Sequence, residues 1–81
     1  MRTSTLANNQ VIIKDGTREE FHSYGTRIAV TDQHAPTMLD PKWDYSNTTR
    51  KYCGEFLGGL KKADILKRIK SGEFVVENLN P

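Results

Sequence analysis

Residues that build disulfides and metal sites are scarce in this sequence. It has one cysteine, Cys53, and two histidines, His22 and His34. A lone cysteine cannot form a disulfide within the chain, and with two histidines it cannot complete the four ligands of a structural zinc site. We therefore expect a protein of a reducing compartment, without a metal ion or another cofactor.

Long hydrophobic runs are absent as well. No stretch approaches the roughly 18 apolar residues of a membrane span. Residues 1–10 lack the apolar segment of a secretory signal peptide. These absences predict a soluble intracellular protein with no membrane among its partners.

The low apolar content limits the hydrophobic core. The chain has 81 residues, of which 36% are hydrophobic and seven are aromatic. A chain this short forms one domain and buries only about 60% of the surface that it exposes when unfolded. We expect a flexible arm over residues 1–9, which are rich in threonine and asparagine, and a single domain over residues 10–81. A core this small is often completed by a partner or by a second copy of the chain.

Charge is unevenly distributed along the chain. The net charge is only +2. Residues 1–49 carry −1, whereas residues 50–81 carry +3. A basic half can mark a surface for a polyanion, although a solvated helix face has the same composition.

The first half of the chain has the short β-branched and aromatic runs of a sheet. The candidate strands are Gln10–Lys14, a pattern that runs from Phe21 through Gly25 to Thr31, and Thr37–Asp40. Asp15-Gly16 is a turn signal that favours a type I′ hairpin turn. Gly25, inside the second pattern, indicates a β-bulge or a close approach of backbone. We predict three to four antiparallel strands packed on one face, with an extended segment at Glu73–Val76 that could add a strand or pack over the sheet.

A helical period replaces the alternation of the strands after residue 46. Ser46 is a good N-cap, because its hydroxyl can accept a hydrogen bond from a free backbone N–H one turn later. The residues that share one face of this helix are Thr49, Tyr52, Cys53 and Phe56. Gly58-Gly59 ends the pattern. Cys53 lies on the apolar stripe, where a thiol behaves as a small hydrophobic group.

A second helix is predicted over residues 61–71. Ile65, Leu66 and Ile69 form its apolar stripe, and Gly72 is placed to end it. The fold class is therefore α+β, a small antiparallel sheet of three to four strands followed by two short helices.

The sequence contains no convergent set of catalytic residues. Neither His22 nor His34 has a serine or cysteine at a motif spacing, and a histidine beside an aromatic residue on a strand usually makes a structural hydrogen bond. We predict no catalytic residue and no enzymatic activity.

The most informative stretch is the start of the first helix. The free N–H groups of a helix start attract anions, and here hydroxyls, cations and aromatic rings surround them. The candidate binding residues are Trp43, Tyr45, Ser46, Thr48, Thr49, Arg50 and Lys51, with Lys61 and Arg68 from the second helix. They predict a contact surface for phosphate, nucleic acid or a protein partner. The alternative is structural: Trp43 packs the strands onto the helix, Ser46 caps it and the threonines fill its first turn.

The same residues carry a resemblance to a known group. Ser23–Ala29 reads SYGTRIA, and Trp43–Lys51 reads WDYSNTTRK. This pattern, with Phe56-Leu57-Gly58 after it, resembles small open reading frames of bacteriophages and prophages. The resemblance covers residues 22–58 and implies a phage-encoded accessory protein that acts in the cytoplasm of an infected bacterial host. It implies no particular activity.

The function that these observations predict is binding. We expect a small phage-encoded protein that binds a host or phage protein and inhibits or modulates host machinery. One alternative is a nucleic-acid-binding module that uses the basic helix start. Another is a structural protein that assembles with copies of itself. Because phosphate contacts release counterions, the salt dependence of binding separates the first two.

Overall fold

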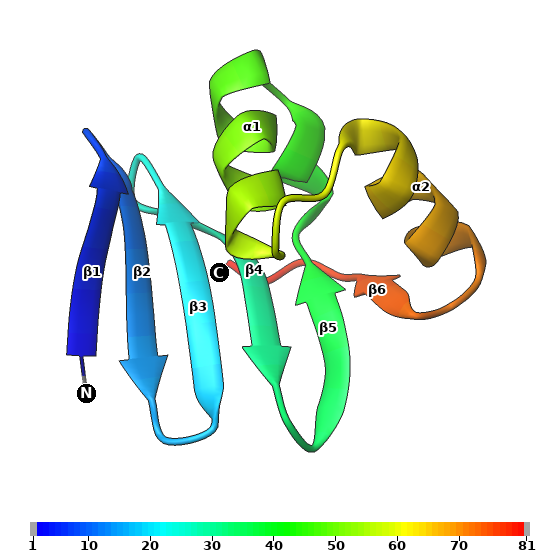
Figure 1. The fold of residues 1–81 in the computed structure, drawn as a ribbon, viewed down its shortest axis with the longest axis horizontal. Coiled ribbons are helices and arrows are strands. Elements are labelled where there is room, and N and C mark those ends of the chain that lie inside the picture. Colours follow the sequence, from blue (N-terminus) through cyan, green and yellow to red (C-terminus); the bar gives the residue numbers. More distant parts are fainter. Residues whose placement is uncertain (1, 81) are drawn as a thin grey trace.

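The fold is a single sheet with its helices on one face (Figure 1). The computed structural model describes residues 2–80. The strands are β1 (Arg2–Ala7), β2 (Gln10–Asp15), β3 (Arg18–Ser23), β4 (Thr26–Asp32), β5 (Ala35–Leu39) and β6 (Phe74–Val76). The 3-10 helix η1 (Pro41–Asp44) and the helices α1 (Asn47–Phe56) and α2 (Lys62–Lys70) lie between β5 and β6. The α+β class is confirmed.

The sheet is larger than the sequence predicted. Its six strands lie in the order β1-β2-β3-β4-β5-β6, and all neighbours are antiparallel except β5 and β6. The prediction of three to four strands was therefore too low. One reason is that Tyr24-Gly25 is a turn between separate strands β3 and β4, where the sequence was read as a strand pattern interrupted by a bulge.

The first strand also escaped prediction. Residues 2–7, expected to belong to a flexible arm, pair with β2 as strand β1. Thr3, Ser4, Thr5 and Leu6 are all exposed. A strand with no buried face has no alternation of polar and apolar residues, so the sequence carries no periodic signal for it. At the other end, the segment that was predicted to be extended does add a strand. Phe74–Val76 joins the sheet as β6, parallel to β5, after the two helices cross over.

Two hairpin turns differ from expectation. The β2–β3 loop is Gly16-Thr17, because Asp15 pairs with Arg18. Of these two, Gly16 has a positive φ (64°) and Thr17 does not, which is the pattern of type II′ rather than type I′. At the β3–β4 loop both Tyr24 (52°) and Gly25 (78°) have positive φ, which is the type I′ pattern. The bulge lies instead at Ile28, which the register skips.

The helices follow the predicted pattern closely. Ser46 is the N-cap of α1, and its hydroxyl accepts a hydrogen bond from the backbone N–H of Thr49 (3.1 Å). Gly58 (φ 99°) follows the end of α1, and Gly72 (φ 86°) follows the C-cap of α2. Leu66 is a correction, because it is 47% exposed and lies outside the apolar stripe of α2.

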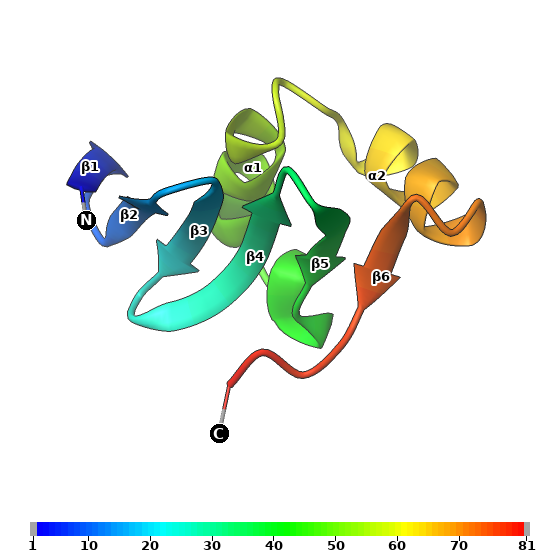
Figure 2. The ribbon, with the colours of Figure 1, turned by 90° about the horizontal axis from the view of Figure 1, so that it is seen from below.

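The core lies between the sheet and the two helices (Figure 2). Its buried members are Phe21, Ile28, Ala29, Leu39, Trp43, Cys53, Ile65 and Phe74. Phe21 stacks on Phe56 of α1, with ring centroids 5.8 Å apart. Within the part of the chain that the structure describes, no helix combines the length and apolar character needed to span a bilayer.

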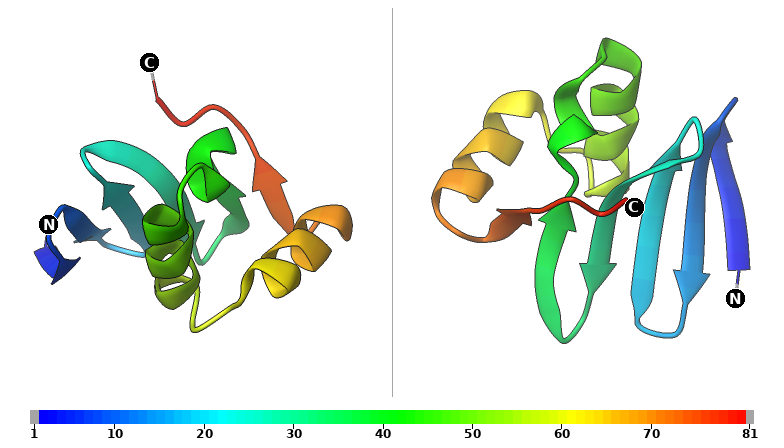
Figure 3. Two further views of the ribbon diagram at one scale, coloured as in Figure 1. Left: turned by 90° about the horizontal axis from the view of Figure 1, so that it is seen from above. Right: turned by 180° about the vertical axis from the view of Figure 1, so that it is seen from behind.

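The C-terminal segment crosses to the face opposite the helices (Figures 2 and 3). The buried carboxylate of Asp40 accepts hydrogen bonds from the backbone N–H of Leu79 (2.9 Å) and the side-chain amide of Asn80 (3.0 Å). The Asn80 side chain also pairs with both the backbone N–H and the carbonyl of Arg27 (3.0 Å each). These contacts tie residues 79–80 to β4.

Candidate functional site

The predicted helix-start residues separate into a buried set and an exposed set. Trp43 is only 6% exposed and belongs to the core, and Thr49 is fully buried. Both were predicted to contact a partner, and the structure corrects both. Trp43 lies within η1, where the N-cap Asp40 accepts a hydrogen bond from the backbone N–H of Lys42. η1 packs against α1, and Trp43 joins the same buried cluster as Cys53. The structural alternative therefore holds for Trp43, for Thr49 and for the capping residue Ser46.

Three of the predicted helix-start residues are exposed to solvent. Tyr45, at the junction of η1 and α1, is 60% exposed. Thr48 and Lys51 are exposed and lie one turn apart, so they share the outer face of α1.

The structure adds Tyr24 to this end of the molecule. The hydroxyls of Ser23 and Thr49 lie 3.0 Å apart, which brings the β3–β4 turn against the first turn of α1. Tyr24, next to Ser23, is 55% exposed. We call Tyr24, Tyr45, Thr48 and Lys51 the helix-start surface. The sequence analysis missed Tyr24 as a surface residue because it read the residue as part of a strand. The Tyr-Gly pair between two short runs was the available turn signal.

The carboxylate of Asp44 already engages two cations near this surface. Asp44 Oδ1 lies 3.0 Å from Arg50 Nη1, and Asp44 Oδ2 lies 3.0 Å from Lys62 Nζ. Burial raises the pKa of Asp44, but the ion pairs with Lys62 and Arg50 outweigh that effect and lower the pKa below its usual value. Arg50 also donates to the side-chain oxygen of Asn47 (2.7 Å). Arg50 therefore links η1 to α1 through its ion pair with Asp44, and its guanidinium is not free to bind an anion.

The two site residues predicted on the second helix lie apart from this surface. Lys61 is the exposed N-cap of α2, and its backbone N–H donates to Asp64 (3.2 Å). Arg68, in the last turn of α2, pairs with Glu73 (2.6 Å), and its guanidinium lies 5.7 Å from the ring centroid of Phe74. Part of the basic character of the second half is therefore neutralised locally.

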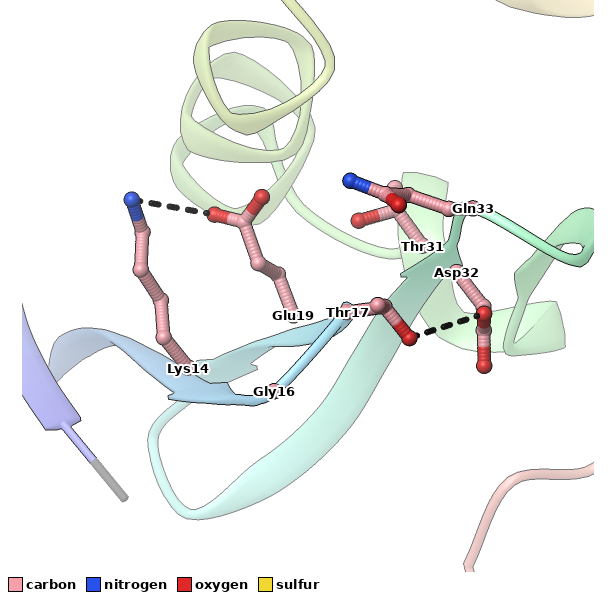
Figure 4. Close-up of a pocket in the computed structure, with 7 residues that line it drawn as sticks. All are labelled: Lys14, Gly16, Thr17, Glu19, Thr31, Asp32 and Gln33. Carbon is pink, nitrogen blue, oxygen red and sulfur yellow. Dashed lines mark hydrogen bonds and ion pairs between the residues drawn. The ribbon is translucent and has the colours of Figure 1, made fainter.

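Arg68 belongs to a groove on the helix-bearing side of the sheet. One part, of about 310 Å³, is lined by Lys14, Gly16, Thr17, Glu19, Thr31, Asp32 and Gln33 (Figure 4). A second part, of about 560 Å³, shares Glu19 and Thr31 and extends to Phe56, Arg68 and Phe74. Its polar groups pair with one another, as in Lys14–Glu19 (3.6 Å) and Thr17–Asp32 (3.4 Å). The lining offers no paired nucleophile and base.

An ionic cluster lies on the opposite, open face of the sheet. The carboxylate of Glu20 contacts Arg27 (2.9 Å), His22 (3.0 Å) and Arg18 (3.1 Å). Burial raises the pKa of Glu20, whereas the hydrogen bond from His22 and the two arginines lower it, and the lowering prevails. A carboxylate with a lowered pKa is a weak base, so the cluster is suited to joining β3 and β4 rather than to proton transfer. Its signal in the sequence is the period-two spacing of Arg18, Glu20 and His22.

The remaining candidates for chemistry are the thiol of Cys53 and a metal-binding group of side chains. Cys53 is buried, and burial raises the pKa of its thiol to about 12, which keeps the thiol protonated and unreactive at neutral pH. Within residues 2–80 no group of three histidine, cysteine, aspartate or glutamate side chains is placed to hold a metal ion.

Comparison with known protein families gives a match over most of the chain. The model of a protein family described as a family of unknown function (DUF8033) matches residues 1–73. No curated protein and no solved structure matches the chain.

Proposed function

Because the chain belongs to this family of unknown function, we propose its function from the site itself: a non-enzymatic binding protein that docks a partner protein on its helix-start surface. The observation that carries the proposal is the conformation of Tyr24. This residue is 55% exposed and has a φ of 52°.

A tyrosine at this position lowers the stability of the folded state. Left-handed φ is unfavourable for bulky residues, and type I′ turns favour asparagine or glycine at both central positions. The ring gains little burial in return. Strain of this kind is characteristic of functional sites, where the side chain serves something other than stability. Exposed tyrosine is also among the residues that contribute most to protein interfaces.

Two side-chain contacts hold the base of this surface in place. The buried Ser23–Thr49 hydrogen bond joins the Tyr24 turn to α1, and the Asp44–Arg50 ion pair joins the Tyr45 segment to the same helix. A surface that is already ordered loses less conformational entropy when it binds. This preorganisation supports a docking role for the two tyrosines.

The resemblance to phage reading frames is the basis for the cellular location and the kind of partner that we propose. Its residues Ser23–Ala29 and Trp43–Lys51 include all four members of the helix-start surface. We therefore place the protein in the cytoplasm of an infected bacterial host. Its partner is a host or phage protein whose activity it inhibits or modulates.

The test is quantitative binding to a partner captured from host lysate treated with nuclease. Tyr24→Asn and Tyr45→Ala should each weaken the purified interaction about tenfold or more, as interface anchors do. Leu66→Ala is the matched control, because Leu66 is a similarly exposed apolar side chain on α2. A complex whose affinity survives both tyrosine substitutions would overturn the proposal.

Nucleic acid binding is the second candidate, favoured by the +3 charge of residues 50–81. The exposed lysines Lys51 and Lys61 would then contact phosphates. Affinity would fall steeply between about 50 and 200 mM salt, and nuclease would abolish capture. Binding that persists through both treatments supports the protein partner.

A further inference from the structure

We propose that an ordered water molecule binds inside the protein, where it joins the side-chain amide of Gln10 to the hydroxyl pair of Ser23 and Thr49. The site lies where β2, β3 and the first turn of α1 meet. This inference does not depend on the docking function proposed above, because its three residues are fully buried and lie outside the helix-start surface.

The amide of Gln10 is the observation that carries the proposal. Gln10 is 0% exposed. Neither its Nε2 nor its Oε1 has a hydrogen-bond partner among the described residues. A buried amide without partners lowers the stability of a fold, because both of its groups give up their hydrogen bonds to water. Native proteins therefore pair the large majority of such groups with protein atoms or with an ordered water.

The strand register places this amide beside the hydroxyl of Ser23. Gln10 and Ser23 lie directly opposite each other in the antiparallel pair of β2 and β3, so their side chains share one face of the sheet. That face bears α1, because Ser23 Oγ lies 3.0 Å from Thr49 Oγ1. The backbone N–H of Tyr24 donates to the carbonyl of Asn9 (2.8 Å). The next pair, Gln10 and Ser23, is therefore of the non-hydrogen-bonded kind, in which facing side chains come closest.

The hydroxyl pair has the capacity for a further hydrogen bond. Two hydroxyls carry two hydrogens, and the bond between Ser23 and Thr49 uses one of them. The other hydrogen and the remaining lone pairs can serve a third group. A water between the pair and Gln10 would accept from Nε2, donate to Oε1 and bond to one hydroxyl. About three hydrogen bonds are typical of a buried water.

Water suits this position better than an ion or a larger molecule. An amide offers both a donor and an acceptor, and water can pair with both, whereas a simple ion can pair with only one of them. The residues opposite Gln10 in the neighbouring strands are Ala7 and Ser23, which are both small. Small neighbours favour room for a molecule whose share of liquid volume is about 30 Å³. The complete burial of Gln10 keeps larger ligands out.

Oxygen-17 magnetic relaxation dispersion of the intact chain tests the proposal, because it counts long-lived internal waters and does not respond to exchanging hydroxyl hydrogens. The wild type should hold at least one such water. Gln10→Met keeps the length of the side chain but removes the amide, so this variant should hold one fewer. Gln33→Met is the matched control, because Gln33 is exposed, and its count should equal that of the wild type.

A second measurement needs no variant, so it decides the matter even if Gln10→Met fails to fold. Nuclear Overhauser cross-peaks between water and the Gln10 amide hydrogens should have the sign of a long-lived water, whereas those of the exposed Gln33 should have the sign of a short-lived one. Circular dichroism establishes that each variant is folded. A wild type without a long-lived water would overturn the proposal. So would a folded Gln10→Met with an undiminished count, or a Gln10 amide that bonds directly to Ser23 or Thr49 without a water.

Discussion

The hydroxyl groups of Ser23 and Thr49 lie 3.0 Å apart in the buried layer between β3 and α1. Twenty-six residues separate them in the sequence, and both are fully buried. This contact joins a sheet turn to the first turn of a helix. The helix-start surface depends on that junction.

Removing one hydroxyl of the pair should destabilise the protein more than its single hydrogen bond suggests. Thr49→Val leaves the Ser23 hydroxyl buried without its partner, which costs about 1–3 kcal/mol. Ser23→Ala has the corresponding effect on Thr49. The double variant should lose less than the sum of the two single variants, because no unpaired hydroxyl remains. Urea denaturation measures all three, and strictly additive losses would contradict this coupling.

Tyr24→Asn should raise stability while it lowers partner binding. Asn-Gly is the preferred sequence for a type I′ turn, so the substitution relieves the left-handed strain by about 1 kcal/mol. Thermal unfolding measures the gain. A lower midpoint for Tyr24→Asn would show that the ring contributes to the fold, and the functional argument from strain would fail.

Gly54→Ala should destabilise α1 although alanine is the better helix former by about 1 kcal/mol. A β-carbon at position 54 would collide with the backbone carbonyl oxygen of Leu60. Leu60 lies close to Gly54 because the Gly54 carbonyl accepts hydrogen bonds from the N–H groups of Gly59 (2.9 Å) and Leu60 (3.0 Å). The net loss should be about 1–3 kcal/mol. Glu55→Ala, exposed on the same helix, is the control and should change the unfolding free energy little.

Asp40 should make stability depend on pH in the acid range. Burial raises the pKa of this carboxyl, but hydrogen bonds from the N–H groups of Leu79 and Lys42 and from the Asn80 amide outweigh burial and lower the pKa below its usual value. The ionised form is therefore stabilised in the folded state. This contribution is fully present above the unfolded pKa of about 3.9 and is lost as pH falls through the lower folded value.

Asp40→Asn removes that contribution. The variant should lose about 1.5–3 kcal/mol at neutral pH, and its deficit should shrink below about pH 4. Asp15→Asn is the control, since Asp15 is exposed. A deficit that stays constant from pH 7 to about pH 2 would show that the ionisation of Asp40 is not involved.

Cys53 should react with thiol reagents only when the protein unfolds. Its thiol is buried and its pKa is raised to about 12, so the thiolate is scarce at neutral pH. Labelling rates should rise with denaturant in parallel with the unfolded fraction. Rapid labelling of the native protein would mean that α1 opens locally at this position.

Much of the helical half could be predicted from sequence. Ser46 and the glycines after residue 57 define α1 by local hydrogen bonding and backbone conformation, which act within one turn of the chain. The strand half was less predictable. β1 has no buried face, and Tyr24 occupies a turn position that its side chain disfavours. β1 therefore produces no periodic signal, and the turn at Tyr24 is signalled only by the glycine that follows it.

The candidate site shows the same division between local and long-range information. Composition and spacing established a capped helix, a thin core, a lone cysteine and a tryptophan beside the helix start. Whether Trp43 faced water or the core, and whether Arg50 was free or paired with Asp44, depended on how η1 packs beneath α1. Likewise, only the tertiary structure brought Tyr24 beside the helix start, because the Ser23–Thr49 contact joins residues that are distant in the chain. Local propensities determine where helices begin and end, whereas exposure and charge pairing are decided by the contacts between elements.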